Sequence, residues 1–516
     1  MKLNYKRTIL VGFAFFLICA FWQAYDATIP VILTNKYGMS QFWSGVIMAL
    51  DNVLALFMLP LFGALSDKCK SKRGKRTPFI IFGTIIAAVA LIALSVVDNM
   101  QLQKISQYTA LDDPKTLSLI YQEQANTELK TPEGEVFVLK DIFSEEDFRE
   151  ITVNISDSET GKNTVNPDYT NYVSPAREAC VAAVTEKDPS ALIVFIALLL
   201  VVLVSMSTFR SPAVALMPDV TIKPLRSKAN AVINLMGTAG GIVVLVLGIV
   251  FATSSVTKVF MSYSVYYLVI GGLMLVSLAI FMLTVREPAW AKQMQEDTVR
   301  YGIEEDEVQE ETRKLSSGEK KSLILILLSV ALWYFGYNAV TSKYAVYATN
   351  ILDMDYNTTM LIAQGAAIVA YLPAGMIASK IGRKKTILAG VAILGIAFGV
   401  ASFMRAGSPV MLMNVLFAAA GVGWATINVN SFPMAVELSS GADVGKYTGY
   451  YYTASMAAQT LTPLLSGFLM DNVADTILFP YAAVFVALAI VTMLFVKHGD
   501  NRVTAKKGLE AFDLED

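Results

Sequence analysis

Three ionisable side chains interrupt long apolar stretches of this sequence. Asp26 lies in AFWQAYDATIPVIL, Asp51 in IMALDNVLALFML, and Arg210 in SMSTFRSPAVAL. A charged side chain inside a bilayer is costly, so such residues generally face a protein interior and handle protons or ions. Burial disfavours an ionised carboxylate and a nearby arginine favours it. We therefore predict that Asp26 carries a coupling proton, alternating between a protonated and an arginine-paired state, with Asp51 and Arg210 as its partners.

Two other roles remain open for these residues. The first is purely structural: a permanent ion pair that holds three helices together. Sodium is the second alternative to a proton, because the carboxylates, Asn52 and backbone oxygens are suitable ligands for a hard cation. The sequence has no phosphate-binding loop, cofactor fingerprint or nucleophile constellation. With three scattered cysteines and a single histidine, His498, we expect no cofactor, no metal site and no enzyme activity; an ion gradient would supply the energy.

Amides and aromatic side chains recur within the same apolar segments. Amides can hydrogen-bond sugar hydroxyls, and flat rings can cover the C–H faces of a sugar. A single aromatic residue in such a segment usually packs or anchors at the membrane interface. The stretches LWYFGYNAV and GWATINVNSFP combine both types, and buried amides need partners. Asn338 and Asn428 are the amides we favour. The candidate substrate-binding residues are Gln23, Asn52, Asn230, Asn234, Trp333, Tyr337, Asn338, Gln364, Trp424 and Asn428.

The elements that position these residues are membrane-spanning helices. The 516-residue chain is 55% hydrophobic and only 16% charged, with a mean hydropathy of +0.52. Soluble domains carry about 25% charged residues, and a helix needs about 20 apolar residues to cross a bilayer. We predict an all-α membrane protein of about twelve spanning helices in two groups of six. The predicted spans are 8–34, 42–66, 78–98, 191–218, 228–252, 264–284, 322–349, 358–379, 385–404, 409–437, 446–470 and 476–496.

Two long hydrophilic segments divide these helices. Residues 99–190 contain 17 acidic and 8 basic residues, and we expect a small folded cap, with a disordered insertion as the alternative. Residues 285–321 form a charged linker that is helical in part. The predicted organisation is 1–98 for the first three helices, 99–190 for the insertion, 191–284 for helices four to six, 285–321 for the linker, 322–497 for the second bundle and 498–516 for a tail.

Lysine and arginine predict the orientation. Basic residues cluster at the N-terminus, in the loop after the second helix and in the loop after the eighth helix. These three sites lie on one side if the helices alternate, and basic loops face the cytoplasm. We therefore predict a multi-pass protein of the plasma (inner) membrane, with both termini in the cytoplasm and residues 99–190 outside.

The loop GALSDKCKSKRGKRTPF (63–79) combines an acid with six cations between residues 68 and 76. Gly63 allows close helix approach, and Asp67 ends a spanning helix. If Asp67 met the other half in only one conformation, it would latch a cytoplasmic gate; the alternative is a pure topology signal. Weaker copies of this loop and of the end of helix four recur in the second half. The predicted gate residues are Gly63, Asp67, Arg73, Arg76, Asp219, Arg226, Arg383 and Glu437.

Within this gate, helix-end charge pairs are predicted at matching places in the two halves. Asp219 would pair with Arg226, and Glu437 with Lys446. Ordinary helix-end pairing without a gating role is the alternative. Internal repeats of this kind build many transporters and place the substrate between the halves, near the membrane midplane.

The loop Gly63-Ala-Leu-Ser-Asp-Lys, followed by Gly-Lys-Arg, resembles the signature of the major facilitator superfamily. Its long spacing, together with RSPAVALMPDVTIKPLRSKANAVINLMGTAGG (210–241), is similar to the sucrose-transporter-like branch of the glycoside–pentoside–hexuronide cation symporters. The resemblance covers all twelve predicted helices. It implies the major facilitator fold, alternating access, and symport of a glycoside such as a disaccharide or small oligosaccharide with a proton.

Two other functions stay open. The first keeps the fold and makes the protein an exporter or antiporter of amphipathic compounds. The second is a non-transporting membrane sensor that uses the 99–190 insertion. The expected partners are a small-molecule sugar and the lipid bilayer. Nucleic acid is excluded, because the basic cluster lies between two spanning helices, and we expect a monomer.

Overall fold

The computed structural model describes residues 3–156, 163–222, 225–301, 315–438 and 444–499, and most of them are helical. Within these residues, ten helices are long and apolar enough to cross a membrane. With the short π-helical or 3₁₀ turns that extend three of them, they are α1 (Tyr5–Val31) with η1 (Ile32–Lys36), α2 (Gln41–Asp67), α3 (Thr77–Lys104), α8 (Ser190–Asp219), α9 (Arg226–Phe251), α10 (Ser264–Thr284), α12 (Ser317–Tyr347) with η6 (Ala348–Leu352), α14 (Arg383–Ala401), α15 (Val410–Val436), and η8 (Asp475–Ile477) with α17 (Leu478–Leu494).

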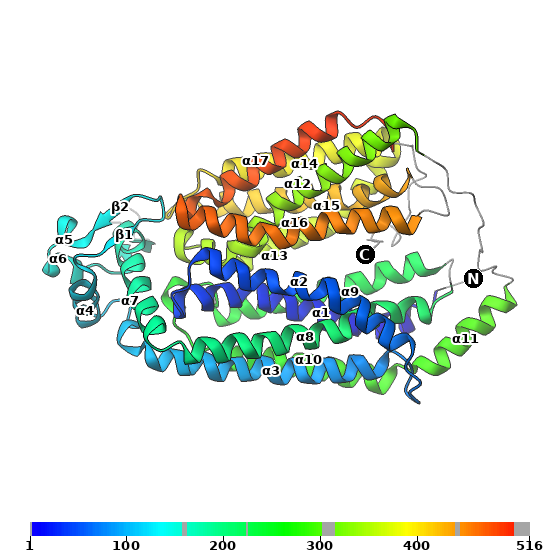
Figure 1. Ribbon diagram of the computed structural model, residues 1–516, viewed down its shortest axis with the longest axis horizontal. Helices are drawn as coiled ribbons and strands as arrows, with labels where there is room; N and C mark the ends of the chain where they lie inside the picture. Colours follow the sequence, from blue (N-terminus) through cyan, green and yellow to red (C-terminus); the bar gives the residue numbers. More distant parts are fainter. Residues whose placement is uncertain (1–2, 157–162, 223–224, 302–314, 439–443, 500–516) are drawn as a thin grey trace.

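Two further long helices, α13 (Tyr356–Ile381) and α16 (Val444–Asn472), run alongside the ten (Figure 1). They occupy two of the predicted spans but are not among the ten helices above, so a total of twelve spans stays a prediction. Polar side chains cap several helix starts by accepting hydrogen bonds from free backbone N–H groups. Ser40 caps α2, Asp355 caps α13, and Ser316 forms a capping box with Glu319 at the start of α12.

The helices form two halves, each around its own apolar core. Helices α1, α2, α3, α8, α9 and α10 surround the first core, and α12 to α17 surround the second. The halves meet where α2 packs along α16, α9 along α13, and α1 against α12. Glycines permit the α2–α16 contact: a Cβ atom on Gly45 would lie 2.1 Å from the carbonyl oxygen of Pro463, and one on Gly467 would lie 2.3 Å from that of Gln41.

The bundle has two distinct ends. We call the end that carries residues 105–189 the insertion end. The opposite end carries the loop at residues 68–76 and the junction of α13 and α14 at Gly382, and we call it the basic-loop end. The two sets of helices run close together at the insertion end and diverge towards the basic-loop end (Figure 1).

The described part of the insertion is folded. Its helices are α4 (Pro114–Gln124), α5 (Leu139–Ile142), α6 (Glu145–Arg149) and α7 (Ser174–Lys187). The strands β1 (Glu128–Lys130) and β2 (Val136–Val138) pair antiparallel, as do β3 (Asn154–Ser156) and β4 (Asn163–Val165). Leu117, Ile120, Leu139, Phe148 and Val173 are fully buried in a core of its own. This core makes the insertion a compact unit and not a loose tail, and it adds two small sheets to an otherwise helical protein.

Several boundaries differ from the sequence-based ones. Helix α3 continues to Lys104, past residue 98, and α12 begins at Ser317, inside the predicted linker. The linker contains a helix, α11 (Glu287–Arg300). Residues 302–314 of the linker and 500–516 of the predicted tail lie outside the described residues.

Candidate functional site

Of the three ionisable residues that the sequence singles out, all in the first half, Asp51 is within electrostatic range of both Asp26 and Arg210. Asp26 on α1 and Asp51 on α2 are half-buried and close enough to repel each other electrostatically. Arg210 on α8 attracts Asp51, and its guanidinium carbon lies 5.9 Å from the centre of the Trp22 ring. Among the described residues, Arg210 forms no direct ion pair with either carboxylate. This arrangement is therefore not a permanent ion-pair staple.

Asn52 is engaged by its neighbour. The Asp51 carboxylate accepts hydrogen bonds from the Asn52 backbone N–H at 2.6 Å and from the Asn52 side-chain amide at 2.9 Å. The amide hydrogens of Asn52 thus help to hold the acid, instead of facing outward towards a ligand.

A pair of amides links the two halves beside these acids. The Gln364 side chain on α13 donates to the Gln23 side-chain oxygen on α1 at 2.7 Å. Gln23 in turn donates to the Tyr356 hydroxyl at 3.2 Å. Tyr356 and Tyr337 are both within electrostatic range of Asp26. The candidate coupling acid therefore faces polar groups of the second half, one of which, Tyr356, the sequence reasoning missed.

Aromatic rings of the second half stack next to this cluster. The Tyr337 and Trp424 rings are 3.6 Å apart between centroids and tilted by only 3°, and Tyr334 meets Trp424 edge-on at 5.2 Å. The side-chain nitrogen of Asn338 is buried and finds no hydrogen-bond partner among the described residues. A buried amide without a partner costs free energy, and a polar ligand would satisfy it.

The remaining amide and aromatic candidates are less closely connected to this cluster. Trp333 is 0% exposed and packs in the core of the second half, so it is not available for ligand contact in this conformation. Asn428 is half-buried and lies one helical turn after Trp424 on α15. Asn230 and Asn234 lie in the first turns of α9 and are also half-buried.

At the basic-loop end, Arg76 is the centre of a polar cluster in the first half. Its Nε donates to the Asp219 carboxylate at 2.8 Å, and its other nitrogens donate to Asp67 and Ser66. Lys75 adds a second ion pair to Asp219 at 3.2 Å. Gly63 brings α2 close to α8, because a Cβ there would lie 2.9 Å from the Ser211 hydroxyl. The described ion pairs of Asp67 are with Arg76 and Lys75, both in its own half.

The predicted pairing of Asp219 with Arg226 is wrong. Arg226 donates instead to the backbone oxygens of Thr221 and Pro218, both at 3.2 Å. The Asp219 carboxylate is already held by Arg76, which arrives from the preceding loop. Arg73, also predicted for the gate, has an exposed side chain outside this cluster.

Glu287, at the start of α11, is a residue that the sequence reasoning missed. Its carboxylate accepts hydrogen bonds from the backbone N–H groups of Lys75, Arg76 and Thr77 at 2.7 to 2.9 Å, and from the Thr77 hydroxyl at 2.7 Å. It is only 2% exposed. A carboxylate at a helix N-terminus is stabilising, so Glu287 ties the linker to the start of α3.

The second half repeats this arrangement. Arg383, at the start of α14, forms an ion pair with Glu437, at the end of α15. This matches the Arg76–Asp219 pair between the start of α3 and the end of α8. Glu437 was predicted to pair with Lys446; its described partner is Arg383, and the Lys446 side chain lies outside the described residues.

At the insertion end, charged and polar groups join the halves directly. The Asp471 carboxylate on α16 accepts hydrogen bonds from the backbone N–H groups of Gln41 and Phe42, at 2.8 and 2.7 Å, and so caps α2. The buried Lys343 amine on α12 donates to the Gln41 backbone oxygen at 2.5 Å. Asn350 donates to Asn35 at 2.6 Å. These contacts close the insertion end in this conformation.

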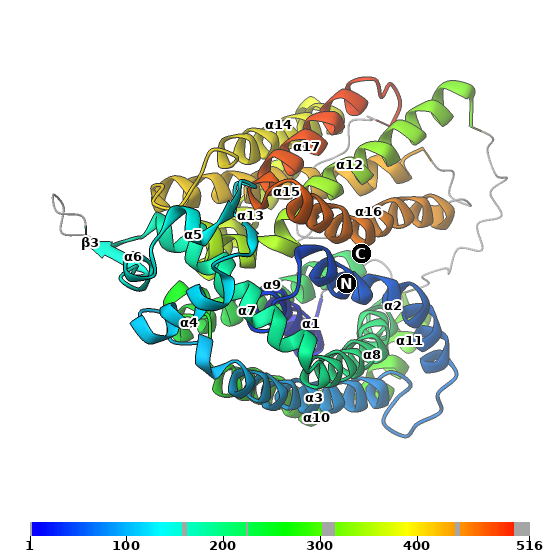
Figure 2. The same cartoon turned by 60° about the vertical axis from the view of Figure 1, so that its left-hand side comes forward.

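The insertion, although it belongs to the first half, also contacts the second. Glu133 forms an ion pair with Arg405 at 2.9 Å, and the Thr476 N–H donates to the Pro132 oxygen at 3.2 Å. Asn350 donates to Glu178 on α7 at 3.3 Å. Figure 2 shows the insertion lying over the ends of helices from both halves. The insertion therefore bridges the closed end.

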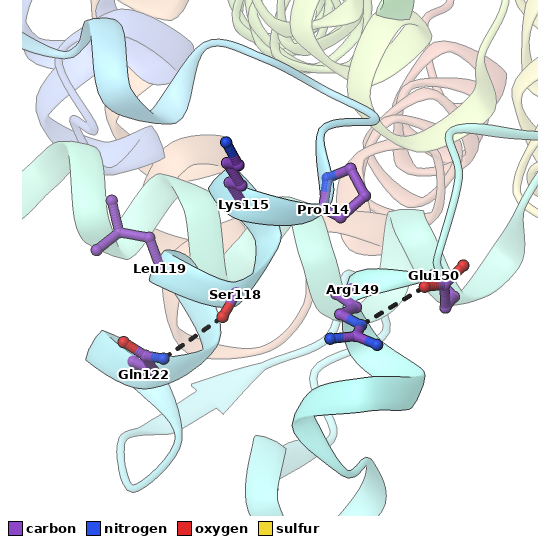
Figure 3. Close-up of a pocket in the computed structure, with 7 residues that line it drawn as sticks. All are labelled: Pro114, Lys115, Ser118, Leu119, Gln122, Arg149 and Glu150. Carbon is purple, nitrogen blue, oxygen red and sulfur yellow. Dashed lines mark hydrogen bonds and ion pairs between the residues drawn. The ribbon is translucent and has the colours of Figure 1, made fainter.

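The insertion also carries a surface hollow of about 420 Å³. Figure 3 shows its lining, in which Arg149 pairs with Glu150 and Gln122 donates to Ser118. Most of these side chains are exposed, and no aromatic ring is among them. It is far less suited to a sugar than the buried cluster around Tyr337.

The protein thus has two helical halves that are joined at one end, with two half-buried acids in the first half and an unpartnered buried amide, Asn338, in the second. The chain belongs to the MFS_1 like family, whose model matches residues 13–481. Within the described residues there is no group of three or more His, Cys, Asp and Glu side chains that could hold a metal ion.

Solved structures share the fold over nearly the whole chain at low sequence identity. The xylose transporter XylE from E. coli, in an inward open conformation, has a TM-score of 0.56 and 16% identity, with 99% of each chain covered. A bacterial homologue of the iron transporter ferroportin, in an inward-facing state, has a TM-score of 0.58 and 11% identity, covering 96% of this chain and 99% of the other.

The similarity to a curated relative is local. The sucrose transport protein SUC4 of Arabidopsis thaliana is 35% identical over 60 residues, which is 12% of each chain. The match thus spans about an eighth of that relative's length. The family and the fold together make this protein a multi-pass transporter of the major facilitator type.

Proposed function

We propose that the protein is a proton-coupled symporter of a glycoside, such as a disaccharide or small oligosaccharide, and that it works by alternating access. The observation that carries this proposal is the Tyr337–Trp424 stack beside the unsatisfied amide of Asn338. Stacked rings and amide donors suit the apolar faces and hydroxyls of a sugar, and a mostly apolar site with a few placed polar groups is typical of ligand sites. The local match to a sucrose transport protein supports the same substrate class.

The coupling chemistry follows from the two acids. Two neighbouring carboxylates in an apolar segment do not both ionise easily. The Asp51 carboxylate already accepts two hydrogen bonds from Asn52, so we assign the coupling proton to Asp26. Asp26 is within electrostatic range of Tyr337 and Tyr356 in the second half, so a change in its charge would alter the interaction between the two halves. We favour a proton over sodium because Asn52 directs its amide hydrogens, and not its oxygen, at the Asp51 carboxylate.

The proposal includes an orientation. The basic-loop end faces the cytoplasm of the plasma membrane, together with both termini, because basic loops favour that side. The insertion end then faces outward, and the conformation described is closed to the outside. Asp67, Arg76, Asp219, Arg383 and Glu437 would belong to the inner gate, with Asp67 as the latch to the second half. Both halves of the site lie in one chain, so a monomer suffices.

The test of the sugar site is binding and counterflow with a panel of glycosides. Purified protein should gain thermal stability with at least one disaccharide, because a ligand that binds only the folded state stabilises it. Trp424→Ala should lose this gain and the counterflow. The control is Trp43→Ala, because Trp43 is 60% exposed and lies outside the cluster. Equal binding by Trp424→Ala and the parent protein would reject this site.

The same panel separates the alternatives. Stabilisation by amphipathic cations or drugs, with no response to any sugar, would indicate an exporter instead. Sugar binding without transport in sealed vesicles, and with no counterflow, would indicate a sensor.

A further inference from the structure

A second hollow lies at the basic-loop end, away from the central cluster. It has a volume of about 250 Å³ and is enclosed by the start of α1, the junction of α8 and α9, and α11. Helix α11 packs against α8, and it lies at that end of the bundle (Figure 1). The transport mechanism proposed above makes no use of this hollow.

Arg7 supplies the unusual chemistry of this hollow. One of its terminal nitrogens donates to the Gln293 side-chain oxygen at 3.4 Å, and its guanidinium carbon lies 4.7 Å from the centre of the Trp290 ring. Its Nε and second terminal nitrogen are buried and have no hydrogen-bond partner among the described residues. Buried charged donors without a partner are costly. Two adjacent N–H groups of a guanidinium also match the geometry of a phosphate or carboxylate.

The hollow also contains one acid, Asp297, which is half-buried. Asp297 and Arg7 attract each other electrostatically, yet no direct ion pair between them is formed. Both charges therefore line the same hollow without a direct ion pair, so each could also interact with a ligand group of opposite sign. Only a ligand with both an anionic and a cationic group would satisfy both side chains.

One wall of the hollow is apolar. Val11, Met217, Val220 and Ile222 form much of it. The hollow is at the same end as the basic loops, where the membrane interface is expected, and Trp290 beside it is a residue type enriched at that interface. The hollow thus offers a charged region next to an apolar wall at the depth of lipid headgroups.

We propose that this hollow binds the headgroup of a phospholipid that carries both a phosphate and a primary amine. The phosphate would lie against the two unpartnered N–H groups of Arg7, the amine against Asp297, and the glycerol end against the apolar wall. Because Arg7 and Gln293 come from α1 and α11, the bound lipid would hold the linker helix to the first half.

The test uses the full-length protein in detergent, with added lipid and two readouts: the thermal unfolding midpoint and lipid retention in native mass spectrometry. Phosphatidylethanolamine should raise the midpoint by several degrees and remain bound at one per chain, and phosphatidylglycerol should do so less. Arg7→Gln should abolish both effects. Asp297→Asn should reduce the preference for the amine-bearing lipid. Lys6→Gln is the matched control, since Lys6 is an exposed neighbour of Arg7, and should behave as the parent protein.

Inorganic phosphate and phosphoethanolamine distinguish a lipid from a soluble anion. Neither should reproduce the effect at millimolar concentration, since neither covers the apolar wall; a full effect from either would overturn the lipid assignment. Equal lipid retention by Arg7→Gln and Lys6→Gln would overturn the site itself. If Arg7→Gln does not fold, Met294→Trp, which fills the hollow from α11, serves instead. Unchanged lipid retention in that variant would overturn the proposal as well.

Discussion

Asp471 on α16 accepts a hydrogen bond at 2.8 Å from the backbone N–H of Gln41, the first residue of α2. The bond crosses from one half of the protein to the other. A carboxylate at a helix start is favoured by the free N–H groups and by the helix dipole. In alternating access the halves must separate at one end while they meet at the other, so this contact holds only while the insertion end is closed.

Removing this carboxylate should open the insertion end. Asp471→Ala removes a charge-assisted cap, which is worth about 0.5–2 kcal/mol, and shifts the equilibrium away from the closed state. A cysteine placed at Ser44, which is 0% exposed, should then react several-fold faster with a membrane-impermeant maleimide than in the parent background. Asn472→Ala is the control, because its exposed amide bonds only within α16. Identical labelling rates in Asp471→Ala and Asn472→Ala would show that Asp471 does not hold this end.

Contact between the insertion and the second half should depend on pH through Glu178. Burial, and then the nearby Asp475 carboxylate, raise the pKa of Glu178 to about 8, against about 4.3 for an exposed glutamate. Glu178 therefore binds a proton more tightly when the insertion contacts the second half than when this contact is broken. The stabilisation of the contact by this proton is fully present below about pH 4.3 and is lost as pH rises towards 8.

Hydrogen exchange of α7 measures this directly. Exchange in α7 should speed up between pH 5 and 8 beyond the intrinsic chemical rate, and Glu178→Gln should remove that excess. The charged group that acts on Glu178 is Asp475. Asp475 in turn interacts electrostatically with Lys343 and Asp471. If Glu178→Gln keeps the full pH dependence, the dependence arises from one of these groups and the assignment to Glu178 fails.

Lys36 and Asp98 form a buried ion pair that should dominate the stability of the first half. The Lys36 amine meets the two carboxylate oxygens at 2.7 and 2.8 Å, and both side chains are 0% exposed. Breaking one partner of a buried pair costs about 3–5 kcal/mol, so Lys36→Met should lower the unfolding midpoint in detergent by many degrees.

The double variant and a surface pair provide the controls. Lys36→Met combined with Asp98→Leu should recover much of the stability, because apolar replacement of both partners is often neutral. Lys104→Met breaks the less buried pair with Asp188 and should change the unfolding midpoint little, because ion pairs near the surface contribute little to stability. A double variant no more stable than Lys36→Met would mean that packing, and not the unpaired charge, accounts for the loss.

Asp67→Asn tests the inner latch. In this conformation Asp67 is 58% exposed and pairs only within its own half, so its loss should change stability and sugar affinity little. If Asp67 bonds the second half when the inner end closes, transport should slow five- to thirty-fold, which corresponds to about 1–2 kcal/mol. Arg73→Gln, an exposed cation outside the cluster, should transport normally. A large loss of sugar affinity in Asp67→Asn, with normal transport at saturation, would contradict the latch.

Residues whose type is costly in a membrane can be selected from the sequence alone. Asp26, Asp51 and Arg210 stand out against apolar neighbours, and Asp51 is within electrostatic range of the other two; their coupling role stays a prediction. Trp333 is a residue whose role the sequence could not predict. Trp333 and Tyr337 lie one turn apart on α12, yet Trp333 is buried in the core of the second half, whereas Tyr337 stacks on Trp424. Which flank of α12 faces the other half depends on tertiary packing, and residue type does not reveal it.

Long-range polar contacts were also beyond the sequence. Glu287 caps a helix that begins 210 residues earlier, and Asp471 caps one that begins 430 residues earlier. In the sequence, Glu287 and Asp471 look like ordinary charged residues near the ends of apolar segments. The partner of Asp219 also could not be predicted from sequence distance. Arg226 is nearer in the sequence, but α3 packs against α8 and so places Arg76 next to the Asp219 carboxylate.

The central claim is tested most directly by uptake of a labelled disaccharide into proteoliposomes under an imposed proton gradient, acidic outside. The protein should accumulate the sugar above equilibrium, and a protonophore should abolish the accumulation. Asp26→Asn should fail to accumulate sugar but still exchange it across the membrane. Accumulation that survives the protonophore and requires sodium, or Asp26→Asn uptake that still responds to the proton gradient, would contradict the account.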